Sequence, residues 1–383
     1  MRAEWNTLKM SEVFNLQMGK TPSRDDCSYW DGNTTWVSIG DIGASKYISE
    51  SKEHITEKAI LETGIKAVPN GNVIMSFKLS VGKVAITSTS LYTNEAIMAF
   101  IPKDGYELLT DYIYYYLKGY KWNGINRAAM GLTLNKASIS QALFSYPPIA
   151  EQERIVGELD LLSGIIDKQK AQLRELDTLA QSIFYDMFGD PITNEKGWQY
   201  KVLGNILNTT SGGTPSKEHR EYYDNGNIPW INSGDLHNMF VYESSKYITK
   251  DGLDNSSAKI FPIDTVLIAM YGATVGEVSI LKLEGSTNQA VCGIFPNEKV
   301  NPVFLYFVLK FSKGFFIKKA AGGAQPNISQ GIIKNYRLIV PPIELQNTFA
   351  EKIENIERQK ELIKQSISDT ETLFNSRMDY YFD

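Results

Sequence analysis

Short apolar runs rich in β-branched residues alternate along the chain with Gly, Asn and Pro, a pattern that predicts strands joined by tight turns. In the N-terminal part these runs are TTWVSI (34–39), NVIMSF (72–77), KVAITS (83–88) and AIMAFI (96–101). Helices with an aromatic face are expected from about Leu108 to Tyr120 and from about Pro302 to Phe311. The pattern therefore favours an α+β fold, with mixed α/β globular domains.

Two later segments, 148–190 and 343–383, repeat apolar residues every three or four positions, which predicts two long helices. Each follows a Pro-Pro pair, which forces extended backbone before the helix. Roughly 40 residues at a rise of ~1.5 Å give a helix about 60 Å long. We expect the two helices to pair within the chain as an antiparallel coiled coil with pseudo-twofold symmetry. In the alternative, each helix only caps its own domain.

The apolar positions expected to pair the helices are Ile155, Leu159, Leu162, Ile166, Leu173, Leu176 and Ile183 in the first helix, and Phe349, Ile353, Ile356, Ile363 and Ile367 in the second. Three polar residues interrupt this seam: Gln169, Lys360 and Thr370. Polar seam residues of this kind are typical of a device that sets the register of the two helices.

The chain also repeats itself. GKTPS at 19–23 returns as GGTPS at 212–216, and TNEAI at 93–97 returns as TNQAV at 287–291. Trp36 and Asp41 match Trp230 and Asp235, each pair 194 positions apart. So long a period excludes solenoid and propeller repeats, which recur every 20–50 residues or so. We therefore expect a tandem duplication. Globular domains at 1–147 and 191–342 would each be followed by one long helix.

Length, hydropathy and the cysteines narrow the class of protein further. The chain has 383 residues, enough for two or three domains, and no apolar run approaches the roughly 20 residues of a membrane helix. The N-terminus lacks the apolar core of a signal peptide, and Cys27 and Cys292 lie at non-equivalent places in the repeat, so a reducing cytoplasm is the expected location.

The net charge of −5 is unevenly distributed. The two long helices carry −5 and −4, whereas the globular segments carry +1 and +3. The acidity of the whole chain therefore does not exclude DNA binding by the globular domains. Because neutralised phosphates supply much of the affinity for DNA, tight binding by this chain needs the help of partners.

Catalytic motifs are absent or weak. There is no phosphate-binding GxxxxGK[ST] loop, no GxSxG and no metal-binding His or Cys spacing. NPVF at 301–304 has some likeness to the N-P-P-[FY] loop of amino-methyltransferases, but Asn followed by Pro is also an ordinary helix start. Asp41 with Glu50 and Lys52 has the D…ExK spacing of some nucleases, but the second unit keeps only Asp235. We therefore expect no catalytic residues, no metal and no cofactor in this chain.

These motifs in this order, present twice, resemble the specificity subunit of type I restriction-modification systems over the whole chain. The resemblance rests on the TPS loops, the W-x4-D-[IL] pattern, the TN-[EQ]-A strands, the loops GLTLNKASIS (131–140) and GGAQPNISQG (322–331), and PPIAEQ (147–152). The second junction, PPIELQ (341–346), is less typical.

The resemblance implies two target recognition domains, each reading one half of a split sequence in double-stranded DNA, and helices that set the gap. It also implies that the paired helices are the docking surface for adenine-methyltransferase subunits, two per chain, which carry S-adenosylmethionine. An ATP-dependent restriction and translocation subunit is the further partner that the resemblance implies. We expect no membrane partner. Half-sites one helical turn apart lie about 34 Å from each other, a distance that a rigid spacer can set.

Candidate DNA contacts fall in three groups. The TPS loops and nearby cations suit phosphate contact: Lys20, Thr21, Ser23, Arg24, Thr214, Ser216, Lys217 and Arg220. The stretch after the central strand differs between the units and suits different half-sites, although drift in a surface loop predicts such a difference too: Lys78, Ser80, Tyr271 and Thr274. The glycine-rich loops and their surroundings offer base or phosphate contacts: Arg127, Asn135, Lys136, Lys318, Lys319, Gln325 and Asn327. For the TPS loops a purely structural turn is an equal alternative.

Two other functions remain open at this point. One is the specificity component of a combined restriction-modification enzyme with fewer subunits. The other, of a different class, is a coiled-coil structural adaptor that does not read DNA. Duplicated domains with unequal loops argue against the adaptor, because an adaptor needs no divergent pair.

Overall fold

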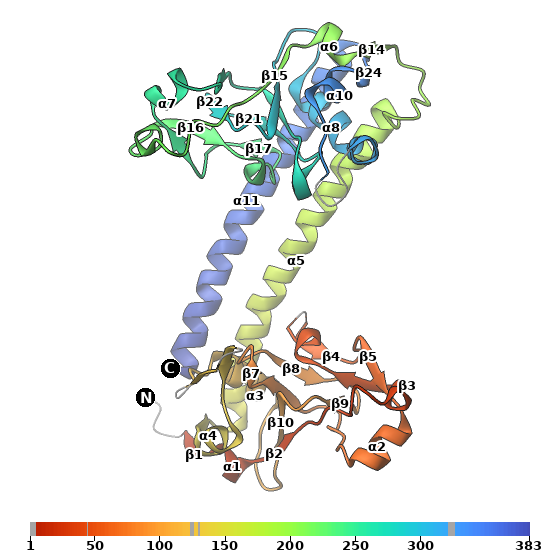
Figure 1. The fold of residues 1–383 in the computed structure, drawn as a ribbon. Coiled ribbons are helices and arrows are strands. Elements are labelled where there is room, and N and C mark those ends of the chain that lie inside the picture. Colours follow the sequence, from red (N-terminus) through yellow and green to blue (C-terminus); the bar gives the residue numbers. More distant parts are fainter. Residues whose placement is uncertain (1–4, 44, 123–125, 129–130, 321–325) are drawn as a thin grey trace. The chain divides into compact units, whose positions relative to one another are not determined.

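The computed structural model describes residues 5–383 apart from 44, 123–125, 129–130 and 321–325 (Figure 1). The chain forms two compact units, residues 1–170 with 365–383, and residues 171–364. Each unit therefore combines one globular domain with parts of both long helices. The predicted α+β fold is confirmed.

The first unit contains short helices and a larger number of short strands. Its strands are β1 (Asn6–Lys9), β2 (Phe14–Met18), β3 (Trp30–Val37), β4 (Tyr47–Ile48), β5 (Glu53–Ile55), β6 (Val73–Ser76), β7 (Lys78–Leu79), β8 (Val84–Thr87), β9 (Tyr92–Thr93), β10 (Ile97–Pro102), β11 (Asn126–Ala128), β12 (Gly131–Thr133) and β13 (Leu143–Tyr146). Its short helices are α1 (Met10–Val13), α2 (Glu57–Thr63), α3 (Thr110–Gly119) and α4 (Lys136–Gln141), with the 3₁₀ turns η1 (Cys27–Tyr29) and η2 (Ile39–Asp41).

The second unit repeats this set. Its strands are β14 (Tyr200–Val202), β15 (Thr209–Ser211), β16 (Ile228–Ile231), β17 (Phe240–Val241), β18 (Tyr247–Ile248), β19 (Ile260–Phe261), β20 (Val266–Ala269), β21 (Val278–Leu281), β22 (Gly285–Thr287), β23 (Val291–Ile294) and β24 (Arg337–Ile339). Its short helices are α6 (Leu203–Ile206), α7 (Lys250–Asp254), α8 (Pro302–Phe311), α9 (Lys313–Lys319) and α10 (Gln330–Lys334), with η3 (Arg220–Tyr222), η4 (Ser233–Asp235) and η5 (Gly272–Thr274).

The main sheets of the two units have the same topology. The strand order is β2-β10-β6-β8-β4 in the first and β15-β23-β20-β21-β17 in the second. In both, only the last strand is parallel to its neighbour. A second sheet contains the parallel pair β3–β9 or β16–β22. The central strands β6 and β20 are buried along their whole length, which explains why their sequences are apolar at successive positions.

The aromatic helices α3 and α8 lie in the cores of their units. Tyr112 and Tyr115 on α3 are almost fully buried, as is Phe304 on α8. The last residue of each long helix packs on the same place: Phe382 meets Tyr112 at a ring-centroid distance of 5.8 Å, and Phe188 meets Phe304 at 4.8 Å. Each long helix therefore ends at a phenylalanine that packs on the aromatic helix of a unit; Phe188 is buried and Phe382 is half-buried.

The long helices are α5 (Ile149–Phe188) and α11 (Ile343–Phe382). In the first unit Glu158 contacts Arg377, and the Gln169 amide donates to Ser366 Oγ at 2.6 Å. Because the partner number falls as the α5 number rises, these segments run antiparallel. In the second unit the order is the same, since Asp177 meets Lys360 and Phe184 meets Phe349.

Burial of the predicted seam is uneven. Ile155, Leu159, Leu162, Ile166, Phe349, Ile353, Ile356 and Ile367 are buried, whereas Leu173, Leu176, Ile183 and Ile363 are half-buried. At the end of α5 the buried face moves to Phe184 and Phe188, which the heptad count did not select. An α-helix with 3.6 residues per turn drifts by about 20° per heptad against a 3.5-residue repeat. Here Phe184 also turns toward the aromatic core formed by α8.

Candidate nucleic-acid interface

The TPS loops are held by the TN-[EQ]-A segments in both domains. Lys20 N donates to Thr93 O at 2.8 Å, and Gly213 N donates to Thr287 O at 2.9 Å. The threonine of each loop uses its hydroxyl in the same contact: Thr21 donates to Glu95, and Thr214 to Gln289. The repeated motifs are therefore two parts of one hydrogen-bonded frame.

The glycine that opens each loop is required by this close approach. A Cβ on Gly19 would lie 2.2 Å from Thr93 O, and a Cβ on Gly212 would lie 2.1 Å from Thr287 O. No side chain fits at such distances, so glycine opens both copies of the motif.

The repeated tryptophans fix the other side of each loop. The indole N–H of Trp36 donates to Lys20 O at 3.1 Å, and that of Trp230 donates to Gly213 O at 3.0 Å. Both rings are buried. The close backbone approach and these hydrogen bonds therefore account for the repetition of the Gly, Thr and Trp residues in both domains.

The end of the central strand continues the frame to the glycine-rich loop. In the first domain Phe77 N donates to Ala96 O and Leu134 N donates to Phe77 O. In the second, Met270 N donates to Ala290 O and Ile328 N donates to Met270 O. Four segments far apart in the sequence are therefore linked in the same order in each domain: TPS loop, TN-[EQ]-A segment, strand end and glycine-rich loop.

Two groups of candidate residues meet at this strand end. Lys78 on β7 pairs with Thr133 on β12, and Tyr271 forms a backbone bridge with Asn327. The backbone places these positions equivalently, yet their side chains differ in chemistry. Tyr271 and Asn327 are exposed, and Lys78 is half-buried. The sequence pattern selected Lys78, Tyr271 and Asn327 but not Thr133, whose position only the strand pairing reveals.

The cations near the two TPS loops differ in their partners. The Arg24 guanidinium pairs with Glu53 and lies 3.9 Å from the centre of the Trp30 ring. The hydrogen bond with Glu53 raises the pKa of Arg24, and the same bond lowers the pKa of the Glu53 carboxyl. In the described part of the chain, the exposed side chains of Lys217 and Arg220 make no hydrogen bond or ion pair.

The remaining candidates take varied positions. Lys20 Nζ donates to Thr63 O at 2.6 Å, and Ser23 and Ser216 accept backbone N–H groups within their turns. Ser80 is exposed, and the Thr274 hydroxyl donates to Tyr271 O at 3.1 Å. Asn135 Oδ1 caps α4 by accepting from Ser138 N at 2.8 Å, while Lys136, Lys318 and Lys319 are exposed. Arg127 lies on β11, and Gln325 lies outside the described residues.

The two motifs that suggested catalysis have structural roles. Asp41 accepts from Ser38 N and Asp235 accepts from Asn232 N, both at 2.8 Å, so each carboxylate closes a 3₁₀ turn. Asn301 caps α8 by accepting from Val303 N, with Pro302 in the first turn. Within the described residues no group of three His, Cys, Asp or Glu side chains is arranged to hold a metal ion.

A network around Lys46 joins the first domain to α5. Lys46 Nζ lies 2.6 Å from Asp111 and 2.5 Å from Asp160, and Tyr47 and Tyr115 donate to the same two carboxylates. Burial lowers the pKa of Lys46, but the hydrogen bonds to both carboxylates outweigh it and leave that pKa above its usual value. The sequence repeat did not single out Lys46, because the equivalent residue of the second domain, just before β17, is Met239.

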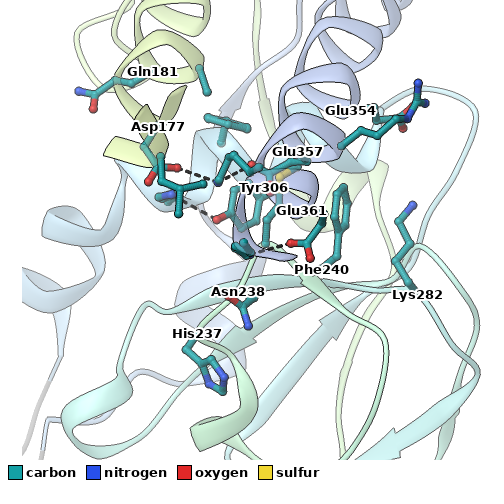
Figure 2. Close-up of a pocket in the computed structure, with 18 of the residues that line it drawn as sticks. Asp177, Gln181, His237, Asn238, Phe240, Lys282, Tyr306, Glu354, Glu357 and Glu361 are labelled. Carbon is teal, nitrogen blue, oxygen red and sulfur yellow. Dashed lines mark hydrogen bonds and ion pairs between the residues drawn. The ribbon is translucent and has the colours of Figure 1, made fainter. Parts of the chain in front are cut away.

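In the second domain the equivalent place is a pocket of about 970 Å³. Figure 2 shows Asp177, Glu354 and Glu357 from the long helices opposite Asn238 and Phe240 from the globular domain. Lys282, Lys310 and Lys360 also line it, so the lining carries both positive and negative groups. Such a lining selects neither an anion nor a cation.

Comparison with known proteins shows which family this chain resembles. The profile of the family described as the type I restriction modification DNA specificity domain matches residues 2–177 and again 195–371. The type I restriction enzyme MjaIX specificity subunit of Methanocaldococcus jannaschii is 27% identical over 399 residues, which cover 94% of this chain and 90% of that protein. The EcoR124I/EcoR124II specificity subunit of Escherichia coli is 26% identical over 243 residues, which cover 61% of this chain and 59% of that protein.

Two solved structures share the fold. A chain from a study of complex assembly and conformational transition of the type I R-M system has a TM-score of 0.64 at 16% identity, covering 99% of this chain and 97% of its own. The type I restriction-modification S subunit from M. genitalium has a TM-score of 0.59 at 14% identity, covering 98% and 95%.

No helix in the described ranges combines the length and hydropathy that crossing a membrane requires. The family profile matches twice and spans most of the chain, with one match on each copy of the duplicated frame. The protein therefore belongs to the family of type I restriction-modification DNA specificity domains, and is a specificity subunit with two tandem target recognition domains.

Proposed function

We propose that each recognition domain of this chain reads one half of a bipartite target on double-stranded DNA, and that α5 and α11 set the gap between the halves. In this proposal the chain contributes no catalytic group. Two adenine-methyltransferase subunits per chain carry out methyl transfer, and an ATP-dependent restriction and translocation subunit completes the complex.

One observation carries the proposal: the two domains share a frame but differ in the residues that pair at the end of the central strand. Gly19, Thr21 and Trp36 have counterparts of the same type that make the same contacts. At the strand end, Lys78 and Thr133 stand where the second domain has Tyr271 and Asn327. Constant support with different side chains at one position is what two readers of different base sequences need.

The proposed contacts divide into two kinds. Lys217 and Arg220 lie exposed beside the TPS loop of the second domain and suit phosphate groups, which position a protein on DNA without selecting sequence. The amide of Asn327 and the hydroxyl of Tyr271 suit base edges, where an amide discriminates adenine by paired hydrogen bonds. With globular segments at +1 and +3, this chain offers little phosphate neutralisation of its own, which fits a reader that works inside a larger complex.

The helices suit the role of a spacer because their pairing is defined along their length. A helix of 40 residues spans about 60 Å, longer than the ~34 Å between half-sites one turn apart. Polar pairs such as Gln169–Ser366 in one unit and Lys360–Asp177 in the other fix the register, since a shift by one turn would separate them.

The test is co-expression with a candidate adenine-methyltransferase subunit from the same host, followed by single-molecule sequencing of host DNA for N6-methyladenine. We expect a split motif with a fixed gap that disappears when this chain is omitted. A stable complex of the two proteins that yields no such motif would contradict the proposal and favour a structural adaptor. A motif produced by a partner that carries both methyltransferase and nuclease domains would indicate a combined enzyme with fewer subunits.

A further inference from the structure

A second pocket of the second unit, of about 710 Å³, lies beside the loop that follows α5. β14, β24 and α10 border it and lie together in Figure 1. Its volume is within the range of about 300–1,000 Å³ that small-molecule sites occupy. Much of its lining is apolar or aromatic, including Ile192, Tyr200, Phe315 and Tyr336.

Hydrogen bonds within the chain hold the walls of this pocket in place. The Tyr200 hydroxyl donates to Ile192 O at 3.1 Å and so fixes the loop after α5 against β14. Tyr336 is buried, and its hydroxyl lies 2.5 Å from Ser312 Oγ. The ring of Phe315 meets that of Tyr336 at a centroid distance of 5.5 Å. The aromatic side chains of the lining are therefore fixed by their own neighbours.

The pocket carries positive charge on this aromatic surface. Among its described lining residues two are cations, Lys319 and Arg337, and none is an acid. Both side chains are exposed, and neither forms an ion pair in the part of the chain that the structure describes. The Arg337 guanidinium lies 4.4 Å from the centre of the Tyr200 ring. The neighbouring carboxylate of Asp190 is occupied, because it accepts from two backbone N–H groups of its own loop. The lining therefore favours a ligand with negative charge.

These lining residues are not part of the duplicated frame. Arg337 stands where the first domain has Leu143, at the interval of 194 that also relates the Pro-Pro pairs. Tyr200 on β14 stands where β1 has Thr7, as the strand pairing shows. In contrast, the buried Ile333 keeps an isoleucine as its counterpart. Because the first domain folds with a leucine and a threonine at these places, packing does not explain the arginine and the tyrosine.

We propose that this pocket binds a nucleotide, with the base on the aromatic wall of Tyr200 and Phe315. The phosphate lies beside Lys319 and Arg337, since a guanidinium binds phosphate oxygens through paired hydrogen bonds. Every nucleobase has a flat face that stacks on an aromatic ring. Asn335 also lines the pocket, and its exposed amide offers a donor and an acceptor to the edge of the base.

This assignment does not depend on the proposed function. Lys319, which the sequence suggested as a DNA contact, belongs to this pocket instead. The same chemistry of base and phosphate occurs in a free nucleotide and in an unpaired nucleotide of a DNA strand, and the experiment separates these two sources.

The first domain supplies the substitutions for the test. Arg337→Leu and Tyr200→Thr introduce the residue types that the first domain carries at the equivalent positions. Lys319→Ala removes the second cation, and Lys318→Ala is its matched control, because Lys318 is an exposed lysine of α9 that does not line the pocket. Isothermal titration calorimetry of the purified full chain measures the affinity for ADP, AMP and inorganic phosphate. Thermal melting checks that each variant is folded.

We expect ADP to bind the wild type and the Lys318→Ala variant with the same affinity. Arg337→Leu and Lys319→Ala should each weaken ADP about 10-fold, as for a lost charge-assisted hydrogen bond. Tyr200→Thr should weaken ADP about 10-fold through lost stacking and leave the affinity for inorganic phosphate unchanged. Arg337→Lys, a milder change at an exposed position, should recover part of the loss, because it keeps the charge without the planar fork.

Competition against ADP identifies the source of the nucleotide. AMP that displaces ADP better than a short single strand of DNA supports a free nucleotide, and the reverse order supports an unpaired nucleotide of a strand. Absence of ADP binding to the wild type would overturn the inference. So would inorganic phosphate that binds as tightly as ADP, or an equal loss from Lys318→Ala and Lys319→Ala.

Discussion

The buried side chain of Gln152 accepts a hydrogen bond at 3.0 Å from the backbone N–H of Leu109, the residue that precedes α3. Its amide donates to Pro147 O at 2.9 Å. Gln346 repeats both contacts, with Asn301 N at 2.9 Å and Pro341 O at 2.8 Å. One side chain therefore joins the start of each long helix to the start of the aromatic helix of the same domain.

Replacing Gln152 or Gln346 by Met should lower the free energy of unfolding by about 1–3 kcal/mol, because buried N–H and C=O groups lose their partners. The Gln152 amide also donates to Glu107 O at 3.0 Å, so Gln152→Met should lose at least as much stability as Gln346→Met. Urea denaturation followed by tryptophan fluorescence measures the change. Gln169→Met is the matched control: Gln169 is half-buried and its Oε1 has no hydrogen-bond partner in the described structure, so less is lost. Equal losses at Gln169 and Gln152 would contradict this assignment.

Glu158 should make the first unit sensitive to acid. A hydrogen bond from Tyr381 lowers the pKa of the Glu158 carboxyl, burial opposes this shift, and a hydrogen bond from Arg377 adds to it. A carboxyl with a lowered pKa stabilises the fold above its ordinary pKa and loses that effect as the pH falls through the folded value.

Glu158→Gln should therefore reduce stability by about 1 kcal/mol at neutral pH, and the difference from wild type should shrink as the pH falls below the ordinary pKa of a Glu carboxyl. Urea unfolding across this pH range tests the prediction. Glu153→Gln, at an exposed position on the same helix, should show no such dependence. A difference that grows as the pH falls would have the wrong sign.

Lys217 and Arg220 should contribute to DNA affinity without changing the sequence that is recognised. Changing both to Ala should reduce the slope of log affinity against log salt by about 2, one for each lost phosphate contact. Arg24 stands where the second domain has Lys217, but its guanidinium is already paired with Glu53. Arg24→Ala should therefore change the slope less. Fluorescence anisotropy of a target duplex with the assembled methyltransferase measures these slopes, and an unchanged slope for the double variant would remove this loop from the interface.

Asn327 and Tyr271 should determine specificity in the second half of the target. Asn327→Ala or Tyr271→Ala should relax discrimination at one base pair by about 10–100-fold, equivalent to about 1–3 kcal/mol. Lys78→Ala should do the same in the first half. Sequencing of N6-methyladenine in host DNA shows which half becomes degenerate. If either second-domain variant relaxed recognition in the first half of the target, the assignment of each domain to one half-site would be wrong.

The two cysteines should differ in reactivity. Burial raises the pKa of the Cys292 thiol to about 12, whereas Cys27 is exposed. Because the thiolate is the reactive form, iodoacetamide at about pH 8 should modify Cys27 in the folded protein and Cys292 only in urea. Intact-mass measurement gives the number of adducts under each condition. Rapid modification of both thiols in the folded protein would show that Cys292 is reached by solvent.

The sequence by itself determined the elements and their duplication. Local patterns are sufficient for this, because strand and helix periodicities extend over a few residues. They predicted α8 with the bounds Pro302–Phe311, and strands within the runs that became β6, β8 and β10. The repeated GKTPS and GGTPS showed that one unit occurs twice, and the order of the motifs indicated the family.

Only the tertiary structure decided which residues in those motifs are available for binding. Thr21 and Glu95 are 74 positions apart and hydrogen-bonded, and Lys78 lies opposite Thr133. The physical reason is that long-range side-chain partners depend on how strands pair and where helices end, which local periodicity does not contain. For the same reason the sequence did not show that Lys46 bridges Asp111 and Asp160, or that the end of α5 buries Phe184 and Phe188.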